Sequence, residues 1–219
     1  MFELLLEPVS DFLYRVLWLF GEGAHRLLLR LTVVGREHLP RRGPFILASN
    51  HVSLIDFIPL QLACRRRLTF LVHRAWYGAW PLRWFFRLTG CLPAEPGQLN
   101  HVAFLEALKA LERGRAICLF PEGERSWTGE LGPGRPGAAY LALQTGAPVV
   151  PVAITGTRRM LPRGSWRLRF GRVTVCFGPP LAFRSPGARN STRSELRRGL
   201  AKLMGAITQL LNREEPSPG

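Results

Sequence analysis

The sequence predicts an α/β fold: a mixed central sheet flanked by helices, with an N-terminal two-helix membrane-associating motif. Two observations carry this prediction. From Gly35 onward, short apolar runs typical of buried strands alternate with helical patterns. Before that point, the chain is rich in Leu, Phe and Trp at helical spacing. At 219 residues, the chain is most simply one folded domain with an appendage.

Residues 1–31 are expected to form amphipathic membrane-anchoring helices. Their apolar side chains recur at steps of three and four and so form one helical stripe: Phe2, Leu5, Val9, Phe12, Val16 and Phe20. No uncharged stretch of 18 residues occurs here, which disfavours a membrane span and favours two short helices lying in the bilayer surface. The alternative is that these helices pack on the core of the domain itself.

Apolar runs predict the strands of the sheet. Three of them are expected to be buried strands: PFILASN at 44–50, RAICLF at 115–120 and APVVPVAITG at 147–156. A fourth stretch, RLRFGRVTVCFG at 167–178, predicts a pair of strands around Gly171.

Helical patterns separate these runs. Residues 100–114 predict an amphipathic helix with Asn100 as its N-cap and Gly114 as its stop. Its expected core-facing side chains are Val102, Leu105, Leu108 and Leu111. Residues 138–146 predict a second helix that ends at Gly146.

The last helix is predicted over 191–213, where Thr192 and Glu195 form a capping box. Its expected core-facing side chains are Leu196, Leu200, Leu203, Ile207 and Leu210. The folded domain is therefore predicted over 32–213, and residues 214–219 are expected to be a disordered tail.

The charge balance is strongly basic. The chain has 30 Lys and Arg against 15 Asp and Glu, a net charge of +15, and only Lys109 and Lys202 are lysines. Such a surplus indicates an anionic partner: nucleic acid, a membrane surface or a phosphorylated substrate. A general compositional preference for arginine would produce the same surplus.

The spacing of cysteine and histidine argues against several classes of protein. The four cysteines, at 64, 91, 118 and 176, form no C-x-x-C pair, which argues against a zinc ribbon or a disulfide scaffold and suits a reducing compartment. The five histidines have no metal-ligand spacing. The sequence also lacks G-x-S-x-G, P-loop and G-x-G-x-x-G motifs.

In ILASNHVSLIDFIPL, His51 precedes Asp56 by five residues. On a single α-helix the two side chains would point about 140° apart. They can meet only if His51 lies in the loop after the strand and Asp56 begins the next helix. Pro59 then falls in the first helical turn, where its missing N–H costs nothing. The alternative is a simple helix N-cap at Asp56 and an ordinary loop histidine.

A second loop follows a buried strand in ICLFPEGERSWTGEL. Pro121 and Gly123 fit the second and fourth positions of a type I turn, which leaves Glu122, Glu124 and Arg125 unexplained. Ligands of open α/β sheets bind at the carboxyl ends of strands. We therefore expect this loop and the His51 loop to converge on one cleft.

Four stretches together resemble the glycerolipid acyltransferases with a His-x-x-x-x-Asp motif, in particular the 1-acylglycerol-3-phosphate acyltransferases. They are NHVSLID, FPEGERS, VVPVAITGT and FGPPL, which occur in the order typical of that family between about Gly35 and Leu211. One departure concerns TGCLPAEPG, where Glu95 and Pro96 stand at the place of an arginine that the family uses for the acceptor phosphate. Arg74, in FLVHRAWYG, is the candidate replacement.

The resemblance implies an acyl transfer from acyl-CoA or acyl-ACP to the hydroxyl of 1-acylglycerol-3-phosphate, giving phosphatidic acid. It makes His51 the general base and Asp56 its orienting carboxylate, with Glu122, Gly123, Arg125 and Arg74 binding substrate. Backbone N–H groups at the start of the helix after His51 are the expected oxyanion donors. No metal or tightly bound cofactor is implied.

Alternatives remain for the acceptor and the class. Another lysolipid, such as a lyso-aminolipid or a lysophospholipid, fits the same chemistry. A basic nucleic-acid-binding domain is a remote alternative, because no recognition motif accompanies the charge. The acceptor and the anchor place the expected enzyme on anionic lipids at the cytoplasmic face of a membrane, with no nucleic-acid partner.

Overall fold

The computed structural model describes residues 29–74, 86, 90–94, 101–183 and 192–214. Seven strands make one sheet: β1 (Leu31–Val34), β2 (Phe45–Ser49), β3 (Leu68–His73), β4 (Leu92–Ala94), β5 (Ala116–Leu119), β6 (Val149–Thr155) and β7 (Val173–Phe177). The helices are the 3-10 turn η1 (Arg36–His38), α2 (Phe57–Ala63), α5 (His101–Glu112), α6 (Gly137–Thr145), α7 (Thr157–Met160) and α8 (Arg193–Glu214).

The sheet has the strand order β1-β7-β6-β2-β5-β3-β4. Neighbouring strands are parallel except β6 and β7, which pair antiparallel. The predicted mixed central sheet flanked by helices is therefore confirmed. β2 lies between β5 and β6 at the middle of the sheet, and all three strands run in one direction.

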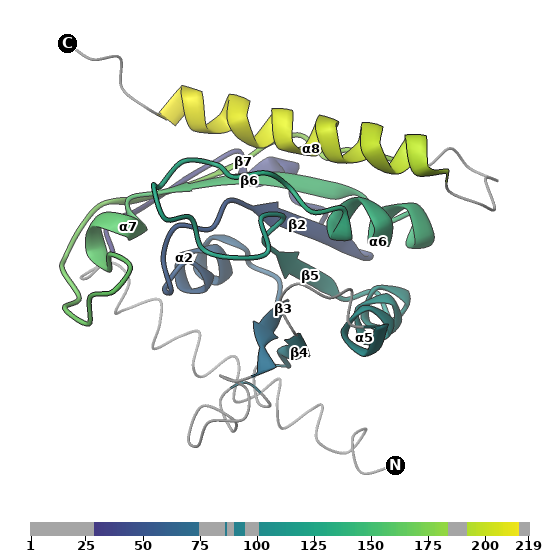
Figure 1. Ribbon diagram of the computed structural model, residues 1–219, viewed down its shortest axis with the longest axis horizontal. Coiled ribbons are helices and arrows are strands. Elements are labelled where there is room, and N and C mark those ends of the chain that lie inside the picture. Colours follow the sequence, from purple (N-terminus) through teal and green to yellow (C-terminus); the bar gives the residue numbers. More distant parts are fainter. Residues whose placement is uncertain (1–28, 75–85, 87–89, 95–100, 184–191, 215–219) are drawn as a thin grey trace.

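Helices cover both faces of the sheet (Figure 1). Alternation along β2 assigns the faces, because Phe45 and Leu47 join the core beneath α2 whereas Ile46 and Ala48 join the core beneath α5, α6 and α8. Both cores are apolar and β2 is fully buried on either side. The buried centre holds the carboxyl end of β2 rigidly, and that end carries His51.

The core-facing side of α5 differs from the prediction. Its bounds agree, but Val102 and Leu105 are exposed, whereas Ala103, Ala107, Ala110 and Leu111 are buried. Small alanine side chains let α5 approach the sheet and α6 closely, while Leu111 is buried and Leu108 packs against the core as predicted. Asn100, the predicted N-cap, lies outside the described residues.

The predicted strand pair at 167–178 is wrong in its first half. Only Val173–Phe177 forms a strand, β7, while residues 166–170 are all exposed. A strand needs one apolar face to bury, and no described residue covers either face of this stretch.

The C-terminal helix agrees with its prediction. Thr192 N–H donates to the Glu195 carboxylate at 2.7 Å and Glu195 N–H donates to Thr192 Oγ1 at 3.2 Å, which is the expected capping box. Leu203, Ile207 and Leu210 are buried against the sheet. Residues 1–28, which hold most of the predicted membrane-anchoring helices, lie outside the described residues. The predicted tail beyond 214 also lies outside them.

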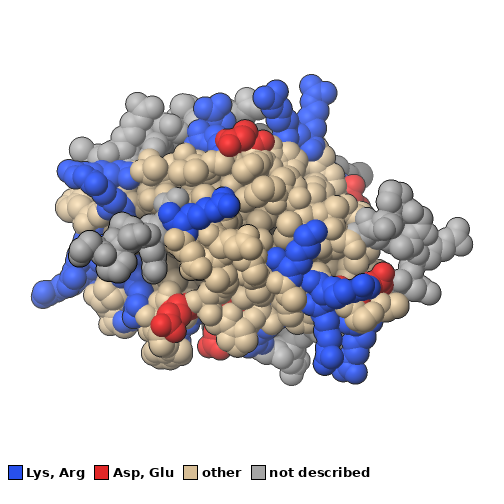
Figure 2. Space-filling model, turned by 90° about the horizontal axis from the view of Figure 1, so that it is seen from above, with Lys and Arg blue, Asp and Glu red and all other residues tan. Residues whose placement is uncertain are grey.

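The positive charge is spread over the surface. Figure 2 shows the face covered by α8, where Lys and Arg lie both at the edge and across the face, with fewer Asp and Glu among them. Within the described ranges, no helix is both long and apolar enough to cross a membrane.

Candidate active site

Strand register brings the two motif loops together. β2 and β5 are parallel, with Ala48 opposite Leu119, so His51 and Glu122 each emerge three residues beyond that pair. The His51 N–H donates to Glu122 Oε1 at 2.8 Å, and the Ser126 N–H donates to the His51 carbonyl at 2.8 Å. The predicted convergence of the two loops is therefore what the structure shows.

The predicted pair of His51 and Asp56 is in contact. The His51 Nδ1 lies 2.8 Å from Asp56 Oδ2, and Asp56 is fully buried while the His51 side chain is 19% exposed. Asp56 holds its position because the same Oδ2 accepts the N–H groups of Val52 at 2.8 Å and Ser53 at 2.9 Å.

The alternative role of Asp56 as a helix cap is not what the side chain does. Asp56 occupies the position before α2, and Pro59 is the third helical residue, as expected. Yet the carboxylate makes no capping bond to the helix and turns back to the His51 turn instead. Since Val52 and Ser53 donate to Asp56, their N–H groups are not free to bind an oxyanion.

The imidazole is fixed by two contacts. Its Nδ1 edge bonds to Asp56, and its face stacks on Phe120 with ring centroids 3.9 Å apart and planes 13° apart. The opposite nitrogen, Nε2, is the one left to meet a substrate. A neutral imidazole with Nδ1–H bonded to a carboxylate has Nε2 as its basic atom.

The third motif, on β6 and α7, is tied to the same turn. Asn50 bridges β2 and β6, because its amide donates to the Ile154 carbonyl at 3.0 Å and accepts the Ile154 N–H at 2.7 Å. The Ser53 hydroxyl donates to the Leu161 carbonyl at 2.8 Å. The His51 turn is therefore held from both neighbouring strands.

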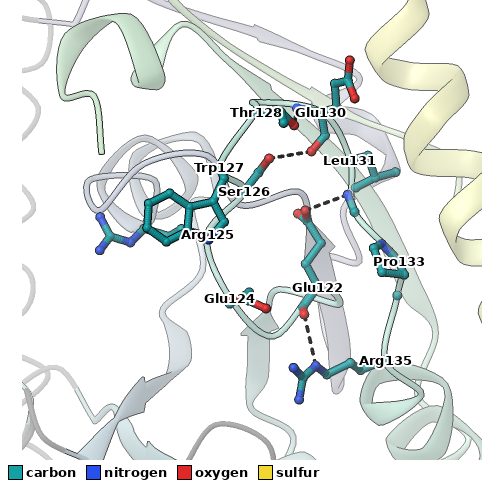
Figure 3. Close-up of a pocket in the computed structure, with 12 residues that line it drawn as sticks. Glu122, Glu124, Arg125, Ser126, Trp127, Thr128, Glu130, Leu131, Pro133 and Arg135 are labelled. Carbon is teal, nitrogen blue, oxygen red and sulfur yellow. Dashed lines mark hydrogen bonds between the residues drawn. The ribbon is translucent and has the colours of Figure 1, made fainter. Parts of the chain in front are cut away.

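The buried Glu122 holds the second loop in place through hydrogen bonds. Its Oε1 accepts the His51 N–H, its Oε2 accepts the Gly132 N–H at 2.9 Å, and its carbonyl accepts from Arg135 Nε at 3.2 Å (Figure 3). Both carboxylate oxygens are thus committed to backbone amides. The geometry gives Glu122 a positioning role.

Gly123 completes the predicted turn. Its N–H donates to the Phe120 carbonyl at 3.0 Å, and its φ of 75° is left-handed. A Cβ here would lie 2.7 Å from Arg135 Cδ, so both conformation and space require glycine.

Arg125 follows that turn and projects away from Glu122 and Arg135 (Figure 3). Partial burial lowers the pKa of Arg125, and the nearby Arg163 guanidinium lowers it further, whereas the Asp56 carboxylate acts in the opposite direction. Arg163 donates to the Arg125 carbonyl and lies over the Trp127 ring, with its guanidinium carbon 3.2 Å from the centroid. Two cations thus stand beside the His51 turn.

Arg74 directly follows β3 and is exposed. Because β3 is parallel to β5, it emerges at the same edge of the sheet as the Glu122 loop. Its part in substrate binding stays a prediction. Glu95 and Pro96, which replace the expected family arginine, lie outside the described residues.

A hollow of about 430 Å³ lies inside the second loop and is lined by residues 122–135, among them Glu122, Arg125 and Arg135. His51 is not part of its lining. Among the described residues, no three His, Cys, Asp or Glu side chains gather in a group that could hold a metal ion.

Sequence reasoning missed three residues of the site. Asn50, Phe120 and Arg163 each make the contacts above across long sequence separations. Asn50 and Phe120 are the first residues of the NHVSLID and FPEGERS motifs, so the motifs themselves contained a usable signal. No motif distinguishes Arg163 from the many other arginines of the sequence.

Comparison with known proteins assigns the chain to a family. A protein-family model described as Acyltransferase matches residues 30–155, and the chain belongs to that family. The 1-acyl-sn-glycerol-3-phosphate acyltransferase of Limnanthes alba is 32% identical over 173 residues, covering 76% of this chain and 57% of that protein. The alpha enzyme of the same name from Bos taurus is 27% identical over 156 residues, covering 70% and 54%.

A solved structure is similar over nearly the whole chain. The 1-acyl-sn-glycerophosphate (LPA) acyltransferase PlsC of Thermotoga maritima matches with a TM-score of 0.77 and 26% identity, covering 97% of this chain and 84% of that one. By contrast, the chain spans about half the length of the curated relatives that it matches, for example 44% of the chloroplastic enzyme of Brassica napus.

Proposed function

We propose that this protein transfers an acyl group from an acyl thioester to the free hydroxyl of 1-acylglycerol-3-phosphate and releases phosphatidic acid. The observation that carries the proposal is the 2.8 Å contact between His51 Nδ1 and Asp56 Oδ2 in a turn bonded to the Glu122 loop. Family membership and the names of the similar enzymes support the same chemistry.

The reaction needs a base because a free hydroxyl is a poor nucleophile near neutral pH. His51 Nε2 takes the hydroxyl proton as the acceptor oxygen attacks the thioester carbonyl carbon, and such a base contributes about 10²–10⁴-fold. When the tetrahedral intermediate collapses, the C–S bond breaks and the imidazolium returns the proton to the leaving thiolate. No covalent enzyme intermediate is required.

Asp56 supports that base in two ways. Its carboxylate accepts the Nδ1–H and so selects the tautomer with a basic Nε2, and its negative charge stabilises the imidazolium that forms. Burial strengthens the second effect because the surrounding dielectric constant is low.

The acceptor's phosphate is assigned to Arg125, with Arg74 as a further cation from β3. A guanidinium matches a phosphate with two parallel hydrogen bonds. Glu122 and Gly123 shape the loop that presents Arg125. The lysolipid stays in a membrane, so we place the enzyme on an anionic bilayer surface at its cytoplasmic side, with residues 1–31 as the anchor.

A panel assay tests the proposal. Purified protein receives lysophosphatidic acid, lysophosphatidylcholine, lysophosphatidylethanolamine or a lyso-aminolipid, each with acyl-CoA and, separately, with acyl-ACP. Phosphatidic acid as the dominant product supports the proposal, and the better donor identifies the co-substrate. Equal or greater acylation of an acceptor without a phosphate monoester would reject it and favour the alternative acceptors. The His51→Ala protein is the blank.

A further inference from the structure

An exposed strip of arginine and aromatic residues stands beside the candidate site. Residues 158–172, RRMLPRGSWRLRFGR, contain six arginines and no acidic residue. We call this segment the basic-aromatic strip. Three of its apolar side chains are unusually exposed: Trp166 is 83%, Leu168 58% and Phe170 77% accessible. Large apolar side chains in a row on a surface mark an interaction site.

The strip has its own conformation. The Arg169 N–H donates to the Met160 carbonyl at 2.9 Å and the Ser165 N–H donates to the Pro162 carbonyl at 3.1 Å, which closes the segment into a loop. Met160 is buried in the core beneath α2, so the base of the loop is anchored while its tip stands out. The side chains of Trp166, Leu168 and Phe170 are therefore presented outward by a loop with a fixed base.

The strip is continuous with the His51 turn. Leu161 accepts from Ser53, two residues after the proposed base. Arg158 donates to the carbonyls of Trp127 and Thr128, and Arg163 lies over the Trp127 ring. Trp127 is itself 71% exposed, so it adds a fourth outward apolar side chain between the strip and the Arg125 loop.

We propose that the basic-aromatic strip, together with Trp127, is a docking surface for an anionic lipid bilayer. Trp and Phe favour the boundary between acyl chains and headgroups, and arginine beside them attracts anionic phosphates. The absence of any acidic residue in 158–172 makes the surface complementary to that charge. The exposed side chains enter the boundary while the arginines bind the headgroup layer.

This inference deepens the proposed function and rests on it for its purpose. A lysolipid acceptor lies in the bilayer with its headgroup at the surface. Docking through the strip sets the Arg125 loop and the His51 turn at headgroup level, so the acceptor moves into the site without leaving the membrane. The strip lies outside residues 1–31 and thus adds a second contact that orients the active site.

A site-specific fluorescent label tests the docking surface. Since all four native cysteines are buried, a label on Leu168→Cys goes selectively to the strip. The matched control is Gln209→Cys on the exposed side of α8, whose buried residues join the core on the opposite face of the sheet from α2. Full-length labelled protein is mixed with vesicles of phosphatidylcholine alone or with one third phosphatidylglycerol.

We expect the label at 168 to shift to the blue and to be quenched by spin-labelled lipids with the anionic vesicles, and the label at 209 to stay unchanged. No shift at 168 while the protein co-sediments with vesicles, or equal shifts at both positions, overturns the proposal. A shift at 168 caused by an RNA oligonucleotide and not by vesicles also overturns it. These readouts need no acyl transfer, so an inactive protein that shifts leaves the surface standing and rejects only the proposed reaction.

An activity comparison provides a second test. In the double variant Trp166→Ser/Phe170→Ser, acylation of long-chain lysophosphatidic acid in anionic vesicles should fall roughly tenfold or more, because the docking contact is lost. Acylation of a short-chain, water-soluble lysophosphatidic acid should be unchanged. An equal fall on both acceptors would assign these residues to the fold or the site and would contradict a membrane role.

Discussion

The carboxylate of Glu122 accepts the backbone N–H of His51 at 2.8 Å, and this bond, with the one from the Ser126 N–H to the His51 carbonyl, joins the two motif loops. Its other oxygen accepts the Gly132 N–H, so the buried side chain spans from the His51 turn to the far end of the second loop. The position of the proposed base therefore depends on a residue that need not touch substrate.

Glu122→Gln is expected to destabilise the fold and to lower activity. The amide keeps one oxygen, so its NH₂ group faces either the His51 or the Gly132 N–H and leaves that buried donor unpaired. We expect a loss of about 1–3 kcal/mol in the free energy of unfolding. Urea titration measures it, and Glu124→Gln, an exposed neighbour, is the control. Equal urea midpoints for the two variants would contradict this structural role of Glu122.

His51 and Asp56 are expected to act as one catalytic unit. His51→Ala should lower kcat by about 10²–10⁴-fold, and Asp56→Asn should also lower it because the tautomer and the imidazolium lose their support. The double variant should lose little more than His51→Ala alone, since Asp56 acts through the imidazole. Additive losses in this double-mutant cycle would separate the two roles.

The matched control for that cycle is His38→Ala. His38 bonds through Nδ1 to the Phe177 carbonyl at 2.8 Å, at the opposite edge of the sheet. The substitution removes a half-buried imidazole that makes a similar hydrogen bond but lies outside the candidate active site. We expect kcat to stay at the wild-type value, and a comparable fall would show that stability and not chemistry is being measured.

Local sequence patterns predicted much of this fold. The residues that the sequence did not predict are those whose roles depend on long-range contacts. Apolar runs bounded by Gly and Pro identified β2, β5 and β6, and the loops after them held His51 and Glu122. The predicted core-facing side of α5 is right for Leu108 and Leu111 and wrong for Val102 and Leu105, because Ala103 and Ala107 take the positions nearest the core. Asp56 was ambiguous because a cap and a histidine partner need the same residue at the same position.

Arg163 is expected to position Arg125 for the acceptor. It donates to the Arg125 carbonyl and adds positive charge beside it, so Arg163→Ala should raise the KM for a short-chain lysophosphatidic acid. The loss of one hydrogen bond to a charged group corresponds to a rise in this KM of roughly tenfold. We expect kcat to change less, and Arg163→Lys to restore part of the KM because the charge returns without the planar stack on Trp127.

Arg113→Ala is the control for that measurement. Arg113 is exposed just after α5 and precedes β5, so it lies at the amino edge of the sheet, away from the site. Removing it changes the net charge by the same amount. If both variants raise KM equally, the overall field of the protein is responsible and the local role of Arg163 is refuted.

The buried thiols are expected to resist modification and to couple stability to alkaline pH. Burial raises the pKa of Cys64 to about 11 and raises that of Cys118 well above its usual range. At pH 8 the Cys64 thiolate fraction is then about one in a thousand, so a disulfide reagent should label the native protein slowly and all four cysteines quickly in denaturant.

The unfolded thiol ionises first, near pH 9, so stability is full below that pH and falls as pH rises toward 11. Urea midpoints should therefore drop less steeply over this range in Cys64→Ala, and identical slopes in the two proteins would contradict the assignment.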